Sequence, residues 1–219
     1  MMEVKQIVQR MMSAGVHFGH KDKNPKMVSY IYTEKDDLQI IDLLQTYKYL
    51  KYASQFLFNA CKNGQQVLFV GTKKHIAKCI EQTAIECNSW YINKRWLGGL
   101  LTNLSTIQKS LQKSQAFALT KKEMVRLERR KKRLHKYLGG VETMTKLPDI
   151  VIIIGQQKEI NAVRECRKLK IPSLTILDSN CDPSLTDLFI PANDDSLASV
   201  NFILNQLSKA IKEGKKYVN

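Results

Sequence analysis

The residues best suited to chemistry in this sequence are lysines and arginines gathered in short runs. The longest run, KKEMVRLERRKKRLHKYLGG at 121–140, holds nine Lys or Arg and two Glu before two glycines. Shorter groups stand in HKDKNPK (20–26), TKK (72–74) and NKRWLGGLLTN (93–103). Cations bind phosphate and release its counterions, and free N–H groups at a strand-to-helix turn such as TKK favour phosphate as well. These groups predict a partner rich in phosphate.

Four separated basic patches on one rigid domain suit an irregular folded RNA, because RNA is recognised largely by shape and backbone. Trp96 follows two cations, and its indole ring either stacks on a base or anchors the core; the sequence leaves both readings open. The residues expected to contact RNA are Lys21, Lys23, Lys26, Lys73, Lys74, Lys94, Arg95, Trp96, Arg129, Arg130, Lys131 and Arg133.

Glycine motifs of nucleotide-binding enzymes do not occur. A phosphate loop needs G-x-x-x-x-G-K-[ST], but six residues separate Gly64 from Gly71, and Thr72 precedes Lys73. Neither G-x-G-x-x-G nor the G-x-S-x-G turn of hydrolases is present. The sequence therefore does not indicate nucleotide hydrolysis or nucleophilic catalysis.

Metal chemistry is the next possibility. His17 and His20 could share an ion with Asp178 or Asp182, but zinc usually takes three or four ligands at set spacing. Loop histidines that bond to backbone or phosphate are the simpler interpretation. Helix starts and turns also favour aspartate, so capping accounts for the acids of the C-terminal third: Asp178, Asp182, Asp187, Asp194 and Asp195. Cys181 has no basic neighbour that would activate it. We expect no catalytic residues, no metal and no cofactor.

Composition limits the class of protein further. The 219 residues include 35 Lys or Arg and 20 Asp or Glu, a net charge of +15, which favours nucleic acid over a membrane surface as partner. The five cysteines form no C-x-x-C pair, so a reducing compartment is expected. The longest apolar run, IVIII at 150–154, is too short to span a bilayer, and the N-terminus resembles neither a secretory signal nor an import leader.

The positions of these residues depend on strands and helices that alternate along the chain. All-apolar strands between amphipathic helices predict a parallel sheet covered on both faces, with ligands beyond the carboxyl ends of the strands at 71–74, 155–157 and 178–180. The expected strands are 66–71, 89–93, 148–155, 171–178 and 187–193. The expected helices are 4–16, 39–64, 72–88, 158–170 and 194–214.

Between 103 and 140 this alternation stops. Leu104, Ile107, Leu111 and Ala118 form one helical seam, and a capping box of Thr120 and Glu123 begins a second helix. The second seam contains Met124, Leu127, Leu134 and Leu138. We expect an α-helical hairpin, a short coiled coil of about 25–30 Å, inserted in an α/β domain. The predicted division is 1–102 and 141–219 for the α/β domain and 103–140 for the hairpin.

Six motifs, in this order, resemble the small-subunit ribosomal protein family called S-two: GVHFGH with NPKM, FVGTKK, NKRWLGGLLTN, YLGG with LPDIVIII, IPSLTILDSNCDP and IPANDDSLASV. The resemblance covers about residues 12 to 212. It implies a flavodoxin-like (Rossmann-like) α/β domain with a protruding helical hairpin, and a structural role on small-subunit rRNA without catalysis. Two departures stand out: the loop between His20 and Asn24 is shorter than usual, and Gly155 replaces an Asp.

The resemblance also implies partners and a location. Neighbouring small-subunit proteins are expected contacts, and bacterial members help to retain the large mRNA-binding protein S-one. The forms PANDD and NCDP are similar to plastid-encoded members, which favours a chloroplast ribosome, with the bacterial cytoplasm as the alternative. Two other functions stay open: an enzyme that binds phosphate or nucleotide at Gly71 to Lys74, and an interaction module of the same lineage away from the ribosome.

Overall fold

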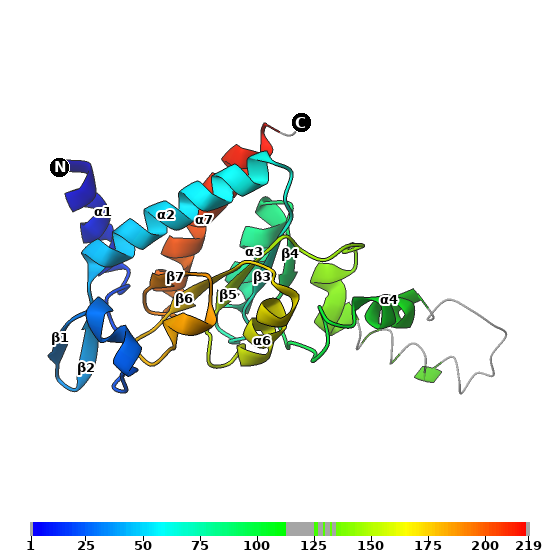
Figure 1. Ribbon diagram of the computed structural model, residues 1–219, viewed down its shortest axis with the longest axis horizontal. Coiled ribbons are helices and arrows are strands. Elements are labelled where there is room, and N and C mark those ends of the chain that lie inside the picture. Colours follow the sequence, from blue (N-terminus) through cyan, green and yellow to red (C-terminus); the bar gives the residue numbers. More distant parts are fainter. Residues whose placement is uncertain (1, 113–124, 127–128, 130–131, 133–134, 218–219) are drawn as a thin grey trace.

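A parallel five-stranded sheet forms the centre of the molecule. The computed structural model describes residues 2–112, 125–126, 129, 132 and 135–217 (Figure 1). The strands are β3 (Val67–Val70), β4 (Trp90–Ile92), β5 (Ile150–Ile154), β6 (Ser173–Leu177) and β7 (Leu188–Pro191). They lie in the order β4-β3-β5-β6-β7, with every neighbouring pair parallel. Counted along the chain this is 2-1-3-4-5, the flavodoxin order, so the expected α/β class is confirmed.

The sheet forms because its three middle strands are apolar throughout. VLFV, IVIII and SLTIL are buried at every position, as strands covered on both faces must be. Successive side chains point to opposite faces, so Phe69 joins one hydrophobic cluster and its neighbours Leu68 and Val70 join the other.

Helices cover the two faces unequally. α1 (Met2–Ser13), α2 (Leu43–Lys62), α3 (Ala77–Glu86) and α7 (Leu197–Lys215) supply the cluster that contains Phe69. The other face packs against α6 (Ile160–Leu169) and buried residues of 96–101 and 138–144. Figure 1 shows α2 and α7 side by side across one side of the sheet, with α6 on the opposite side.

The pair α2 and α7 is fixed by caps and by one glycine. Asp42 accepts a hydrogen bond from the Leu44 N–H (2.9 Å), and Ser196 accepts one from the Ser199 N–H (3.4 Å). These caps satisfy N–H groups that have no partner in the first turn of a helix. Gly214 allows the close approach, because a Cβ there would lie 2.6 Å from the Phe58 carbonyl oxygen.

The N-terminal third differs from the prediction in one respect. The helix expected from residue 39 begins at Leu43, and before it lies an unpredicted antiparallel hairpin of β1 (Ile31–Lys35) and β2 (Leu38–Ile41). Its turn is made by Asp36 and Asp37, with φ of 52° and 62°, as a two-residue type I′ turn requires. A short 3₁₀ helix, η1 (Pro25–Tyr30), precedes the hairpin.

The predicted insertion is described at its base. α4 (Leu104–Gln112) extends away from the sheet in Figure 1, and residues 135–138 are helical before η3 (Gly139–Val141). Leu138 of the expected second seam is buried, while Ala118, the Thr120 capping box and most of that seam lie outside the described residues. A last 3₁₀ turn, η4 (Pro183–Leu185), precedes β7. None of the helices in the described ranges combines the length and apolarity needed to cross a bilayer.

Candidate nucleic-acid interface

The predicted basic groups at TKK and NKRW follow strands of the parallel sheet, so they meet at one edge. Residues 71–76 follow β3, 93–96 follow β4 and 155–159 follow β5. In a sheet of this order the ligand crevice lies between the loops after its first and third strands, here β3 and β5. This edge is therefore where a cofactor or phosphate site would be expected.

A glutamate of the chain links the two loops that border that crevice. Glu159, which is 1% exposed, accepts hydrogen bonds from the Thr72 N–H (2.9 Å) and the Thr72 hydroxyl. The Lys158 ammonium donates to the Thr72 carbonyl across the same gap (3.0 Å). Burial raises the pKa of Glu159, and the bonds from Thr72 oppose that rise. An N–H group expected to receive phosphate is thus occupied by an internal carboxylate.

Lys73 is directed inward as well. Its ammonium contacts Asp194 Oδ1 at 2.6 Å and Asp195 Oδ1 at 2.7 Å, and its side chain is only 16% exposed. Burial alone would lower the pKa of Lys73, but the two carboxylates outweigh burial and hold that pKa above its ordinary value. Its charge is compensated inside the protein, and the ion pair ties the loop after β3 to the loop after β7.

A further carboxylate of this edge is Asp178, which is 2% exposed. Burial, and then the negative charge of Asp194, raise the pKa of Asp178 to about 6. Its Oδ1 accepts from the backbone N–H groups of His20 (3.1 Å) and Ser179 (2.6 Å). The segment around His20 is thereby held on the end of β6.

The histidines and a candidate cation site adjoin this cluster. His20 Nε2 lies 2.9 Å from Asp195 Oδ2, and the ligand atoms of His20, Asp178 and Asp195 fall within 4.8 Å of one another. The Lys73 ammonium already places a positive charge on Asp195, so the cluster is charge-compensated by the chain itself. Burial lowers the pKa of His17, and its Nδ1 has no hydrogen-bond partner among the described residues.

Capping explains only part of the acidic set. Asp182 is a helix cap as expected, because its carboxylate accepts a hydrogen bond from the Ser184 N–H (2.9 Å) at the start of η4. Asp187 instead accepts from the backbone and hydroxyl of Ser173. For Asp194 and Asp195 the capping explanation is wrong: they are the partners of Lys73, and Ser196 caps α7.

Trp96 is a core residue by its contacts. It is 8% exposed, and its indole N–H donates to Glu165 Oε1 at 2.9 Å. The same carboxylate accepts from the N–H groups of Gly99 (2.8 Å) and Leu101 (3.0 Å). Glu165, on α6, therefore fixes the loop that carries Lys94 and Arg95. Sequence reasoning missed this residue, because nothing near position 165 marks it as a partner of the loop.

Outside residues 103–140, four of the predicted cations remain available at the surface: Lys21, Lys74, Lys94 and Arg95. All are exposed, and no carboxylate in the described part of the chain pairs with them. Lys74 stands at the outer end of the β3 loop, and Lys94 and Arg95 follow β4.

Two further lysines are exposed but paired. Lys23 contacts Glu34 at 3.1 Å, and Lys26 contacts Asp182 at 2.9 Å. Exposed pairs of this kind contribute about 0–1 kcal/mol, so a phosphate can replace the carboxylate at small cost.

The described ends of the predicted insertion, at α4 and residues 135–138, are held in place. The Gln108 side-chain amide donates to the Met144 carbonyl (2.8 Å), and His135 Nδ1 lies 3.1 Å from Glu142 Oε2. Of the four predicted contacts here, Arg129 is exposed. Arg130, Lys131 and Arg133 lie outside the described residues.

The fold and this edge define a class: a doubly wound, strongly basic α/β protein. Its crevice keeps a space of about 460 Å³, and Lys73, Asp194 and Asp195 of its lining are paired with one another. The family model described as Ribosomal protein S2 matches residues 11–214. This chain belongs to the ribosomal protein S2 family, which confirms the resemblance found in the motifs. It is a family of ribosomal proteins, so the prediction of a protein without catalysis is confirmed by membership.

Curated relatives extend over nearly the whole chain. The protein named small ribosomal subunit protein uS2c from Oltmannsiellopsis viridis is 49% identical over 225 residues, covering 97% of this chain and 94% of the relative. That from Chlorella vulgaris is 49% identical over 220 residues, covering 95% and 82%. The small ribosomal subunit protein uS2 from Synechococcus sp. (strain JA-2-3B'a(2-13)) is 48% identical over 218 residues, covering 94% and 83%.

Proposed function

We propose that this chain is a structural constituent of the small ribosomal subunit and binds rRNA through the exposed cations of its sheet edge. The observation that carries the proposal is the group Lys74, Lys94 and Arg95, which have no carboxylate partner among the described residues, in a member of this family. Such cations release counterions from phosphate when they bind.

An internal ion pair and internal hydrogen bonds support this role by making the edge rigid. Lys73 ties the β3 loop to the β7 loop, and Glu165 holds the loop behind Lys94 and Arg95. Phosphate contacts fix the register and orientation of a protein on nucleic acid and carry little sequence information. A rigid set of outward cations suits a protein that positions folded RNA.

The predicted insertion is the second rRNA-binding element in this proposal. In this proposal residues 103–140 form the helical hairpin, and residues 1–102 and 141–219 form the α/β domain that carries it. The hairpin places Arg129, Arg130, Lys131 and Arg133 on rRNA. Support comes from the sequence pattern and from the base described at α4 and residues 135–138.

Partners and location follow from the relatives. Neighbouring small-subunit proteins are contacts, and a protein of the S-one type is a further partner if the ribosome contains one. The plastid ribosome is the proposed location, supported by the uS2c relatives and the PANDD motif. The cyanobacterial relative at 48% identity keeps the bacterial cytoplasm as the alternative.

Co-sedimentation tests the proposal. A tagged full-length chain should migrate with small subunits in a sucrose gradient at low salt and be released as the salt concentration rises. The variant with Ala at Arg129, Arg130, Lys131 and Arg133 should be released at lower salt than the wild type. A wild-type chain that stays at the top of the gradient contradicts the proposed function. Release of both proteins at the same salt argues only against the hairpin as an rRNA-binding element.

A further inference from the structure

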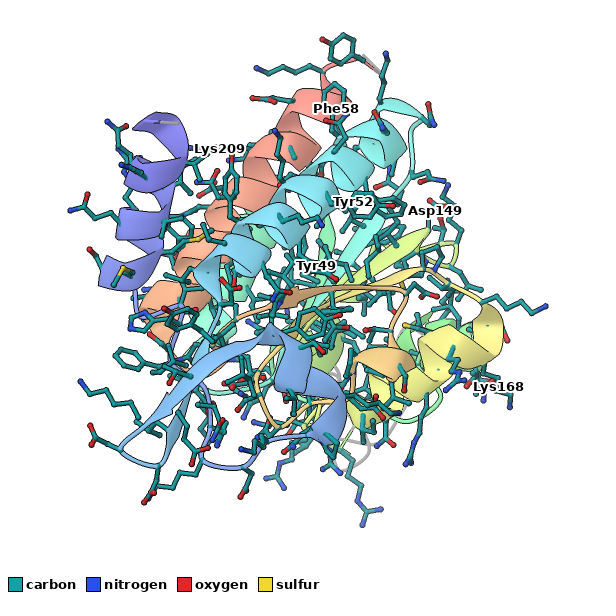
Figure 2. The ribbon with its side chains drawn as sticks, turned by 60° about the vertical axis from the view of Figure 1, so that its left-hand side comes forward. Tyr49, Tyr52, Phe58, Asp149, Lys168 and Lys209 are labelled. Carbon is teal, nitrogen blue, oxygen red and sulfur yellow. The ribbon has the colours of Figure 1, made fainter. Side chains whose placement is uncertain are left out.

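The outer face of α2 is a second surface that the sheet edge does not include. Lys48, Lys51 and Tyr52 are exposed there, with Tyr52 at 62%. Figure 2 shows Tyr49 and Tyr52 on this helix, away from Lys168 on α6. Large aromatic side chains that remain exposed beside cations are features of nucleic-acid-binding surfaces.

The charge of α2 is entirely of one sign. Its 20 residues contain Lys48, Lys51 and Lys62 and no Asp or Glu, whereas α3, α6 and α7 each carry at least one Glu. Surface helices usually intersperse acids among their lysines. No carboxylate in the described ranges pairs with Lys48 or Lys51, so this face is complementary to a polyanion.

The aromatic residues surround a shallow hollow. A space of about 530 Å³ is lined by Tyr47, Lys48, Tyr49, Lys51, Tyr52 and Gln55. Tyr49 is fixed beneath it: its ring stacks on Phe189 with centroids 4.9 Å apart, and its hydroxyl lies 3.3 Å from that of Tyr30. One side of the hollow is therefore rigid, which reduces the entropy lost when a flat ligand binds.

We infer that this face of α2 binds an unpaired segment of the subunit's rRNA, with bases on the tyrosine rings and phosphates on Lys48 and Lys51. The inference rests on the proposed function for the source of the RNA. Unpaired bases expose the flat faces that aromatic rings stack on, and paired bases do not. Tyrosine is enriched at protein–protein interfaces too, so the lysines decide between the two partners: lysine is depleted at protein–protein interfaces and favours the polyanion.

Fluorescence anisotropy of the full-length chain with an unstructured oligouridylate tests the stacking. Tyr52→Ala should weaken binding by about 5- to 150-fold, the range that corresponds to one stacked base. Tyr52→Phe should bind as the wild type does, because the ring is kept. Tyr52→Leu, which keeps apolar surface without a ring, should lose as much as Tyr52→Ala. Lys48→Ala and Lys51→Ala should each reduce the salt slope by about 0.7.

Lys168→Ala, on the opposite side of the sheet, is the matched control. It should leave the affinity for oligouridylate and its salt slope unchanged. If Tyr52→Leu binds as tightly as the wild type, the stacking surface does not exist. Cross-linking identifies the source: a photoreactive phenylalanine analogue at position 52 in assembled small subunits should label rRNA. Label on a ribosomal protein overturns the inference in favour of a protein partner. Neither result changes the co-sedimentation that tests the proposed function.

Discussion

Single residues at the sheet edge show how a charge that suggests ligand binding can serve the fold. Lys73 stands in a run typical of phosphate contacts, yet its ammonium is held between Asp194 and Asp195. Removing it would leave Asp194, 4% exposed, without its partner, and an uncompensated buried charge is strongly destabilising. At this position the ion pair explains the lysine without a ligand.

Asp178→Asn gives a prediction at this scale. The pKa of Asp178 is raised from 3.8 to about 6 by burial and by Asp194, so the stability it contributes is present below about pH 4 and lost as pH rises through 6. Asparagine keeps the oxygen that accepts from His20 and Ser179. Relative to wild type, the variant should therefore gain up to about 3 kcal/mol of unfolding free energy between pH 4 and pH 8. Urea denaturation at both pH values measures this.

For Asp182→Asn we expect a change in stability of the opposite sign to that of Asp178→Asn. Hydrogen bonds from Ser184 and Lys26 lower the pKa of Asp182 to about 2. This variant should lose stability at neutral pH, and its loss should shrink as pH falls from 4 to 2. A difference between Asp178→Asn and wild type that is the same at pH 4 and pH 8 would show that Asp178 is not a strained carboxylate.

These residue roles could not be predicted from the sequence for a simple reason. The partner of Lys73 at Asp194 is 121 positions away, and the partner of Trp96 at Glu165 is 69 positions away. Local pattern can place a lysine in a loop, but it cannot state which distant carboxylate the fold brings beside it. The exposed Lys74, Lys94 and Arg95 were predictable as surface cations, because no local feature required them inside.

At the scale of elements, strand prediction succeeded where the pattern was strongest. Runs such as IVIII are too apolar for anything but the interior of a parallel sheet, and β5 is buried at all five positions. The hairpin of β1 and β2 was missed because β2 has four residues and only Asp42 separates it from α2. Its apolar residues therefore merge with the helical pattern. The two adjacent aspartates at 36 and 37 were the available signal.

The packing of α2 against α7 gives the prediction at this scale. Alanine is favoured over glycine inside a helix by about 1 kcal/mol, but a Cβ at 214 would meet Phe58 O at 2.6 Å and Cys61 Cβ at 2.9 Å. We expect Gly214→Ala to lower the free energy of unfolding by about 1–3 kcal/mol because the two helices must separate. Chemical denaturation measures the loss.

Gly98→Ala is the control, because nothing lies within 4 Å of a Cβ built there. It should leave the midpoint of unfolding nearly unchanged. An equal or higher stability for Gly214→Ala would mean that α2 and α7 pack less closely than described.

The whole molecule combines a crevice whose charges are paired within the chain with positively charged surfaces that are not. The chain has a net charge of +15. At the sheet edge part of this charge is unpaired, because Lys74, Lys94 and Arg95 have no carboxylate partner in the described residues. A protein built in this way gains binding energy from counterion release, so its affinity must fall steeply with salt.

The most direct test of this account is the salt dependence of binding to small-subunit rRNA. Replacing Lys74, Lys94 and Arg95 by Ala should make the slope of log K against log salt shallower by about 2 to 3, close to one for each phosphate that the variant no longer binds. The matched variant with Ala at Arg164, Arg167 and Lys168, exposed cations of α6, should keep the wild-type slope. If the edge variant keeps the wild-type slope, or if both variants change it by the same amount, the sheet edge is not the rRNA interface.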